Sequence, residues 1–139
     1  MRFALLIVLA STMTAIAADT PTAEEKTAMD FVARSGGKAT LDPHLSTEAR
    51  VSAKFEAVSD VILMALKKYP RIGGVDAFDA TRCTDKGLAA LKELPNLRKL
   101  VFGKANLSTE GVSAIGQCTE LRHLALVNAN LSDAELLNL

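Results

Sequence analysis

The stretch LRKLVFGKANLSTEGVSAIGQC, residues 97–118, is followed at residues 121–139 by a close copy, LRHLALVNANLSDAELLNL. A shift of 24 residues, from Leu97 to Leu121, brings the two copies into phase. The pairs that coincide are Leu97 with Leu121, Leu100 with Leu124, Phe102 with Leu126, Asn106 with Asn130, Leu107 with Leu131, Ser108 with Ser132 and Val112 with Leu136. The same shift towards the N-terminus finds a weaker copy at Phe78, Cys83, Thr84, Gly87, Leu88, Leu91 and Leu94. A period in the twenties with L-x-x-L-x-L spacing predicts stacked units of one kind.

Each unit has the pattern of a strand followed by a short helix. Leu97, Leu100 and Phe102 are spaced to place apolar side chains on one face of a strand. Thr84 and Ser108 are good helix N-caps, and acidic residues follow each of them at the positive end of the helix dipole. Because one unit cannot bury its apolar face alone, the units are expected to stack with their strands in a parallel sheet.

Residues Val75 to Leu139 resemble a leucine-rich repeat protein, and the phrases CTDKGLAALKELPNLRKL and LSTEGVSAIGQCTELRHL carry the resemblance. They look like the variant with a Thr-Asp-x-Gly-Leu helix start that is common in exported bacterial proteins and related to the ribonuclease-inhibitor-like group. The resemblance implies an α/β fold, a short right-handed solenoid with parallel strands on one side and short helices on the other. The family often has Asn or Thr at the turn after the strand, where this chain has Thr81, Ala105 and Ala129.

An earlier and weaker unit is predicted at residues 50–70, RVSAKFEAVSDVILMALKKYP. It has alternating apolar residues, a helix start at Ser59-Asp60, and then Leu63 and Leu66 at helical spacing. In the next unit, Asp76 falls where later units have Leu. A register shift to Ile72 and Val75 is preferred to a bulge at this point, because an unpaired buried Asp would be unfavourable.

An amphipathic helix is predicted from Glu24 to Arg34, with Ala28, Phe31 and Val32 facing inward. Gly36-Gly37 is a plausible stop for this helix, and a short strand is expected at Lys38 to Leu41. Solenoids need an atypical end unit, so residues 18–45 are assigned to an N-terminal cap. Residues 46–139 are assigned to about four repeats, the last of them incomplete.

Residues 1–17 have the pattern of a cleaved secretory signal. Arg2 is followed by the apolar run FALLIVLA, and Ala15-Ile16-Ala17 fits a signal-peptidase site. The run is too short to span a bilayer, although a retained membrane anchor is the alternative. The mature protein is expected to be exported, secreted or periplasmic, without membrane insertion. Cys83 and Cys118 are predicted to be buried and unpaired, although that compartment permits a disulfide.

Composition and motifs argue against several classes of function. A chain of 139 residues allows one domain, and a formal net charge of zero argues against a nucleic-acid binder. The two histidines, His44 and His123, fall in different units, and no nucleophile with a base, carboxylate pair or metal-ligand spacing is recognisable. Gly36-Gly37 and Gly73-Gly74 lack the surroundings of a phosphate loop. The prediction is a protein that is not an enzyme and has no cofactor or metal.

The outward face of the strands is the predicted binding surface. Neighbouring parallel strands should place Arg98 beside Arg122 and Lys99 beside His123, about 4.8 Å apart. Like charges stacked in this way repel unless something anionic lies across them, which suggests an acidic protein partner. The alternative is a solvated face whose charges relax into water. The candidate partner-binding residues are Arg98, Lys99, Val101, Lys104, Arg122 and His123.

The C-terminal end carries a second hypothesis. Leu139 aligns with Ile115, in the middle of the preceding helix, and no polar terminal cap follows it. An uncovered last coil would expose an apolar edge that favours self-association and a homo-oligomer. The competing explanation is a truncated reading frame or a repeat remnant. The candidate edge residues are Leu131, Leu136, Leu137 and Leu139.

Overall fold

The computed structural model describes residues 20–137 and residue 139. The predicted signal sequence at residues 1–17 lies outside this range. The strands are β1 (Lys38–Leu41), β2 (Val51–Ser59), β3 (Ile72–Arg82), β4 (Lys99–Gly103) and β5 (His123–Val127). The helices are α2 (Ala23–Arg34), α3 (Asp60–Leu66), α4 (Asp85–Leu91), α5 (Thr109–Gly116) and α6 (Asp133–Leu136).

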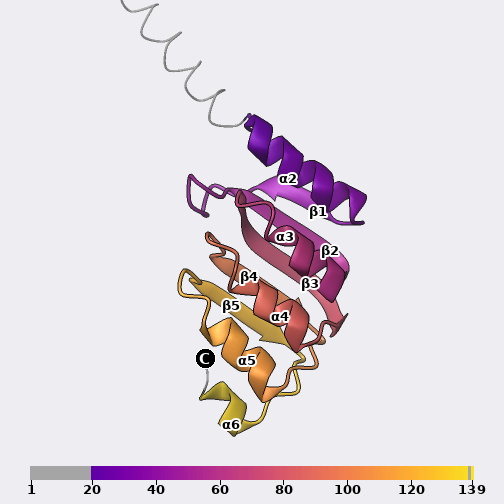
Figure 1. Cartoon of the computed structure of the whole chain (residues 1–139), viewed down its shortest axis with the longest axis vertical. Coiled ribbons are helices and arrows are strands. Elements are labelled where there is room, and N and C mark those ends of the chain that lie inside the picture. The colour runs from indigo at the N-terminus through magenta and orange to yellow at the C-terminus, as the bar shows by residue number, and fades with distance from the viewer. Residues whose placement is uncertain (1–19, 138) are drawn as a thin grey trace, which may run out of the picture.

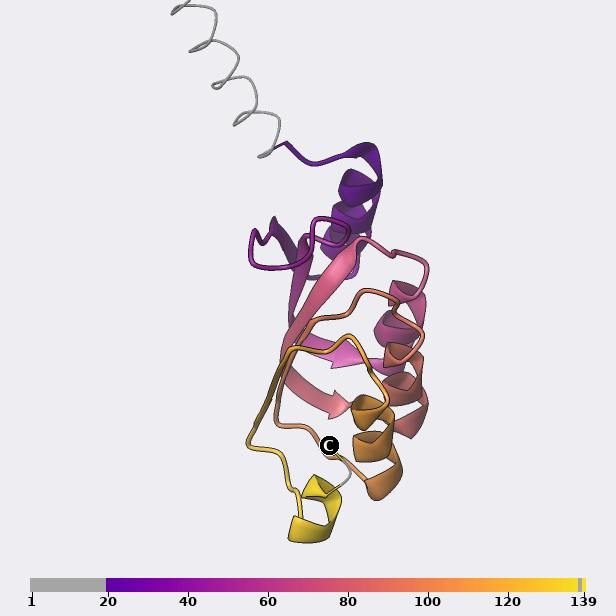
Figure 2. The same cartoon turned by 90° about the vertical axis from the view of Figure 1, so that its left-hand side faces the viewer.

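The described strands form one five-stranded sheet in chain order, β1-β2-β3-β4-β5 (Figure 1). β1 is antiparallel to β2, whereas β2 to β5 run parallel. Strands and helices alternate from β2 onward, and the helices α3, α4 and α5 lie together on one face of the sheet (Figure 2). The fold is therefore an α/β fold with a mostly parallel sheet, as the sequence predicts.

The 24-residue step of the sequence is the step between the neighbouring strands β4 and β5. Leu100 of β4 lies opposite Leu124 of β5, and Lys99 lies opposite His123. The apolar side chains of each unit consequently stack on those of the next, which is how short units that cannot fold alone share one core.

The register between β3 and β4 differs by one residue from this step. Val75 lies opposite Leu100 and is fully buried, while Asp76 faces the other side of the sheet. The predicted register shift is thus confirmed. The alignment of Phe78 with Phe102 is wrong, because Ala77 occupies that place and Phe78 is 67% exposed.

An irregularity within β3 accommodates the extra residue, at the point where its register with β2 shifts between Asp79 and Arg82. The carboxylate of Asp79 accepts hydrogen bonds from the backbone amide of Thr81 (3.0 Å) and from its hydroxyl (2.6 Å). The hydrogen bond from the Thr81 hydroxyl, followed by that from the Thr81 amide, lowers the pKa of Asp79 from its ordinary value. An Asp that bonds the backbone two residues ahead is a common device for stabilising a turn.

The first described segment packs beside β2 as a helix and an antiparallel strand. Thr22 and Glu25 form a capping box at the start of α2, with Glu25 accepting the Thr22 amide at 2.7 Å. Glu25 is 1% exposed and also accepts two hydrogen bonds of 2.9 Å from the guanidinium of Arg50, in the loop before β2. Phe31 stacks on Tyr69 at 4.5 Å between ring centroids. This segment therefore joins the first parallel unit through buried polar and aromatic contacts.

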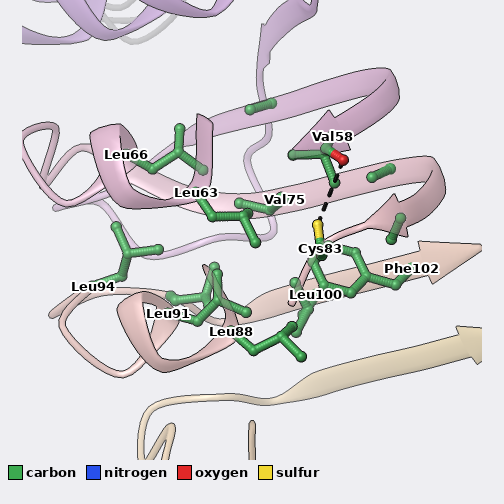
Figure 3. Close-up of a cluster of buried hydrophobic side chains, with 14 of the residues drawn as sticks. Val58, Leu63, Leu66, Val75, Cys83, Leu88, Leu91, Leu94, Leu100 and Phe102 are labelled. Carbon is green, nitrogen blue, oxygen red and sulfur yellow. Dashed lines mark hydrogen bonds between the residues drawn. The ribbon is translucent and has the colours of Figure 1, made fainter. Parts of the chain in front are cut away.

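The core lies between the helices and the sheet. Figure 3 shows leucines of α3 and α4 meeting the inward side chains of β3 and β4. Cys83 is buried among them and its thiol donates to the carbonyl of Val58 at 3.5 Å, whereas Cys118 is partly buried; both cysteines are free. The fully buried members from these elements include Leu63, Leu66, Val75, Leu88, Leu91, Leu100 and Phe102.

The helix starts are joined from unit to unit by carboxylates. Asp60 of α3 accepts the backbone amide of Thr84 (2.7 Å) and its hydroxyl (2.6 Å), and Asp85 of α4 accepts the hydroxyl of Ser108 (2.6 Å). A Cβ on Gly87 would overlap the Asp60 carboxylate, so this helix position requires glycine. The Thr-Asp-x-Gly pattern thus has a physical basis. The Asp accepts a hydrogen bond from the N-cap residue of the next unit's helix, and the Gly leaves space for the Asp of the preceding unit.

Candidate functional site

The face of the sheet opposite helices α3 to α5 carries alternate side chains of the strands, and we call it the open face. Its middle row is Lys54, Asp76, Val101 and Ala125, which lie opposite one another on β2, β3, β4 and β5. These side chains are exposed or half-buried, in contrast to the buried row on the helix side. A ligand that binds to the parallel strands would contact this face, because helices cover the other one.

The loop between β1 and β2 folds over the amino end of β3. A Cβ on Gly73 would overlap the carbonyl oxygen of Ala49, and a Cβ on Gly74 would lie 3.3 Å from the Leu45 side chain. The two glycines therefore make room for this loop. The sequence pattern of Gly73-Gly74 excluded a phosphate loop but did not predict this contact, because the loop is distant in sequence.

This loop and the amino ends of β4 and β5 enclose a cleft of 330 Å³, which we call the basic cleft. Its lining residues are Asp42, His44 and Leu45 from the loop and Arg98, Lys99, Arg122 and His123 from the strands. The Arg122 amide donates to the Arg98 carbonyl at 2.8 Å, and Lys99 lies opposite His123. The structure thus brings together four of the six candidate binding residues, and His44 joins them.

The cations of the basic cleft have no anionic partner within residues 20–137 and 139. The ion pairs of that range join Arg50 to Glu25, Lys67 to Glu93 and Arg71 to Glu24. Asp42, the acidic residue of the cleft, accepts the backbone amide of His44 at 2.9 Å and so helps to shape the loop. With three cations and one carboxylate in its lining, the basic cleft has a net positive charge that attracts anions, most strongly at low ionic strength.

The other two candidate residues, Val101 and Lys104, lie towards the carboxyl ends of the strands. They line a second hollow of 150 Å³, which we call the apolar hollow, with Asp76, Phe78, Gly103 and Val127. The ammonium of Lys104 lies 5.0 Å from the centre of the Phe78 ring, a cation–π contact. Phe78 is 67% and Val127 is 52% exposed. Phe78 was missed as a surface residue because the 24-residue alignment placed it in the core.

The C-terminal candidate residues are mostly exposed. Leu131 is half-buried against the core, whereas Leu136 is 51%, Leu137 is 89% and Leu139 is 48% exposed. Leu124 of β5 is also only partly buried, although its counterpart Leu100 is fully buried. The last described unit therefore presents apolar side chains that the preceding units bury.

Within the described residues, no group of three or more His, Cys, Asp or Glu side chains could hold a metal ion. None of the helices in that range is long and apolar enough to cross a membrane. No protein-family model, curated protein or solved structure matches this chain.

Proposed function

We propose that this protein is a short, right-handed leucine-rich-repeat solenoid that is exported, has no catalytic activity, and binds an acidic protein partner through its open face. The observation that carries the proposal is the basic cleft, where three cations, Arg98, Lys99 and Arg122, outnumber the one carboxylate and form none of the described ion pairs. The 24-residue step between β4 and β5 and the linked helix starts support the repeat assignment.

Charge complementarity favours an acidic partner. Carboxylates placed in the cleft would relieve the repulsion between cations on neighbouring strands and would form charge-assisted hydrogen bonds with the two arginines. Such contacts mainly determine which partner is bound and how fast it associates. The affinity should therefore fall as the salt concentration rises.

The test is the binding of a fluorescein-labelled oligoglutamate peptide, followed by fluorescence anisotropy at about 0.05 M and about 0.5 M salt. We expect salt-sensitive binding that is lost when Arg98, Lys99 and Arg122 are all changed to Glu. The matched control changes Lys68, Lys86 and Lys92 to Glu, because these exposed residues lie on the helix side of the molecule and the net charge changes equally. Equal loss in both variants would mean that general charge, and not the cleft, binds the peptide.

A second candidate function is self-association through the C-terminal edge, which the exposure of Leu136, Leu137 and Leu139 favours. Light scattering after size-exclusion chromatography would then give a dimer or larger species at about 10 µM protein. A variant with Leu136 and Leu137 changed to Ser should be monomeric. Monomeric wild type at this concentration would exclude this candidate.

A further inference from the structure

We propose that the partner segment is an extended peptide with two recognition elements: acidic residues that enter the basic cleft, and one aromatic or large aliphatic residue that enters the apolar hollow. This inference rests on the proposed function and adds the chemistry of the partner to it. The basic cleft and the apolar hollow are two separate hollows on the same face, and the second has no role in binding acidic groups.

Both hollows lie along the same two strands. Lys99, Val101 and Gly103 alternate with buried residues of β4, so all three face the open side. On β5, His123 and Val127 occupy the matching ends, with Ala125 between them. Midway along the two strands lie Val101, which also lines the apolar hollow, and Ala125, and neither side chain is long enough to block the path between the hollows. A peptide lying along β4 and β5 could contact both hollows at once.

The apolar hollow is suited to an uncharged side chain. Phe78 and Val127 expose most of an aromatic ring and about half of an aliphatic side chain, and Gly103 adds no side chain. Covering such surfaces removes apolar area from water, which is the main favourable term in association. Lys104 already contacts the Phe78 ring and lies near Asp79, whose pKa it helps to lower after the Thr81 hydrogen bonds. The charge of Lys104 is thus partly compensated.

Asp76 gives the peptide a preferred orientation. Its carboxylate lines the apolar hollow, so an acidic group of the peptide placed there would be repelled. The same acidic group is attracted at the opposite end of the strands, where Arg98, Lys99 and Arg122 lie. Lys104 balances Asp76 in the hollow, whereas three cations outnumber Asp42 in the cleft. The difference in net charge therefore directs the acidic end of the peptide to the amino ends of β4 and β5.

The strand geometry sets the spacing of the two elements. Lys99 and Gly103 are four residues apart on one strand, a separation of about 13 Å at 3.3 Å per residue. An extended peptide covers the same distance in about four residues. The acidic group and the apolar side chain should accordingly lie about four positions apart.

The experiment uses three labelled peptides and fluorescence anisotropy. The first, Glu-Asp-Glu-Ser-Gly-Ser-Phe, joins acidic residues to Phe at the inferred spacing; the second has Ser in place of Phe; and the third moves Phe next to the last Glu. We expect the first peptide to bind about tenfold more tightly than the other two, since a buried Phe side chain contributes at least that much. The variants Phe78→Ser and Val127→Ser should each remove most of this advantage while binding the second peptide as wild type does.

The matched control is Val61→Ser, which makes the same apolar-to-polar change at a residue that is 77% exposed on the helix α3. Circular dichroism melts establish that all variants are folded. Because Phe78→Ser and Val127→Ser change the hollow independently, a structural effect of one substitution cannot account for the same result in both. Equal affinity of wild type for the first and second peptides would overturn the inference and leave the acidic partner standing. If none of the three peptides binds, the proposed function is overturned as well. A labelled single-stranded DNA is tested in the same way. If it binds wild type more tightly than the first peptide does, and binds the Phe78→Ser and Val127→Ser variants equally well, the ligand is a nucleic acid and the inference is overturned.

Discussion

The carboxylate of Asp60 accepts hydrogen bonds from both the backbone amide and the hydroxyl of Thr84, 24 residues later, at 2.7 and 2.6 Å. Asp60 begins α3 and Thr84 caps α4, so the contact links the helix starts of two successive units. The Asp85–Ser108 bond repeats the arrangement one unit further along. At the next step Thr109 stands where an Asp would be needed, and Ser132 is instead bonded by Glu135 of its own helix.

Replacing Asp60 with Ala should lower the free energy of unfolding by about 1–2 kcal/mol, because the two hydrogen bonds that hold Thr84, the N-cap of α4, are lost together. Urea denaturation followed by circular dichroism measures the change. Asp133→Ala is the matched control, since Asp133 starts α6 but has no described partner in a following unit. If Asp60→Ala lowers the free energy of unfolding no more than Asp133→Ala does, the hydrogen bonds between units contribute nothing to stability.

Replacing Gly87 with Ala should destabilise the protein by about 1–3 kcal/mol, although Ala normally favours a helix over Gly. The new methyl group would displace the Asp60 carboxylate, which lies against this glycine. The effect should shrink in an Asp60→Ala background, and a double-mutant cycle from four urea titrations gives the coupling. Full additivity of the two substitutions would disprove the contact as the cause.

The buried pair of Glu25 and Arg50 should make stability depend on acid pH. Hydrogen bonds from Arg50 are the main cause that holds the pKa of Glu25 below its ordinary value of 4.5, although burial acts in the opposite direction. The ionised pair therefore stabilises the fold fully above pH 4.5, and this contribution declines as pH falls through the lower folded-state pKa.

In Glu25→Gln this part of the acid dependence should disappear, and stability at neutral pH should fall by about 2–3 kcal/mol. Thermal melts across the acid range measure both effects. The control is Glu24→Gln, because Glu24 is an exposed neighbour on the same helix turn with a surface ion pair. Parallel pH profiles for wild type and Glu25→Gln would contradict the prediction.

Replacing Gly73 with Ala should loosen the loop between β1 and β2, because the added methyl group meets the backbone carbonyl of Ala49. We expect a loss of about 1–3 kcal/mol in stability and weaker binding of the oligoglutamate peptide, although no charge is removed. Gly36→Ala serves as the comparison, since no atom lies near its added methyl group, though its φ of +80° adds strain. Unchanged peptide affinity in a folded Gly73→Ala variant would show that the loop is not part of the binding surface.

The two cysteines should differ in reactivity. Burial raises the pKa of Cys83 to about 12, and it also raises the pKa of the less buried Cys118. At about pH 8 Cys83 has almost no thiolate and no access to reagent, so iodoacetamide should alkylate Cys118 first. Mass spectrometry of a Cys118→Ala variant should detect no modification until urea unfolds it. Rapid alkylation of Cys83 in the folded variant would contradict this packing.

The local features of the fold could be predicted because their signals lie within a few residues. The caps at Thr84 and Ser108, the helix and strand of the first segment, and the inward Val75 all follow from spacing, capping and the unfavourable burial of an Asp. The stacking of Lys99 on His123 followed from the 24-residue period.

The contacts that could not be predicted join residues distant in sequence. The pairing of Glu25 with Arg50 and the packing of the 42–49 loop on Gly73 leave no periodic trace, since each occurs once. The place of Phe78 depended on one additional residue within β3, which an alignment of constant period cannot detect. The loop packed on Gly73 and the outward Phe78 both contribute to the candidate surface.

The one-residue difference between β3 and β4 also bears on how such a surface can change through evolution. The segment from Val75 to Cys83 is one residue longer than that from Leu100 to Leu107, and aromatic residues that align in sequence point in opposite directions. Since side chains alternate across a strand, an insertion or deletion of one codon converts an interior ring into a surface ring without changing its identity. In a repeat array, variation in length is therefore a source of new ligand specificity that does not require substitution of any residue in contact with the ligand.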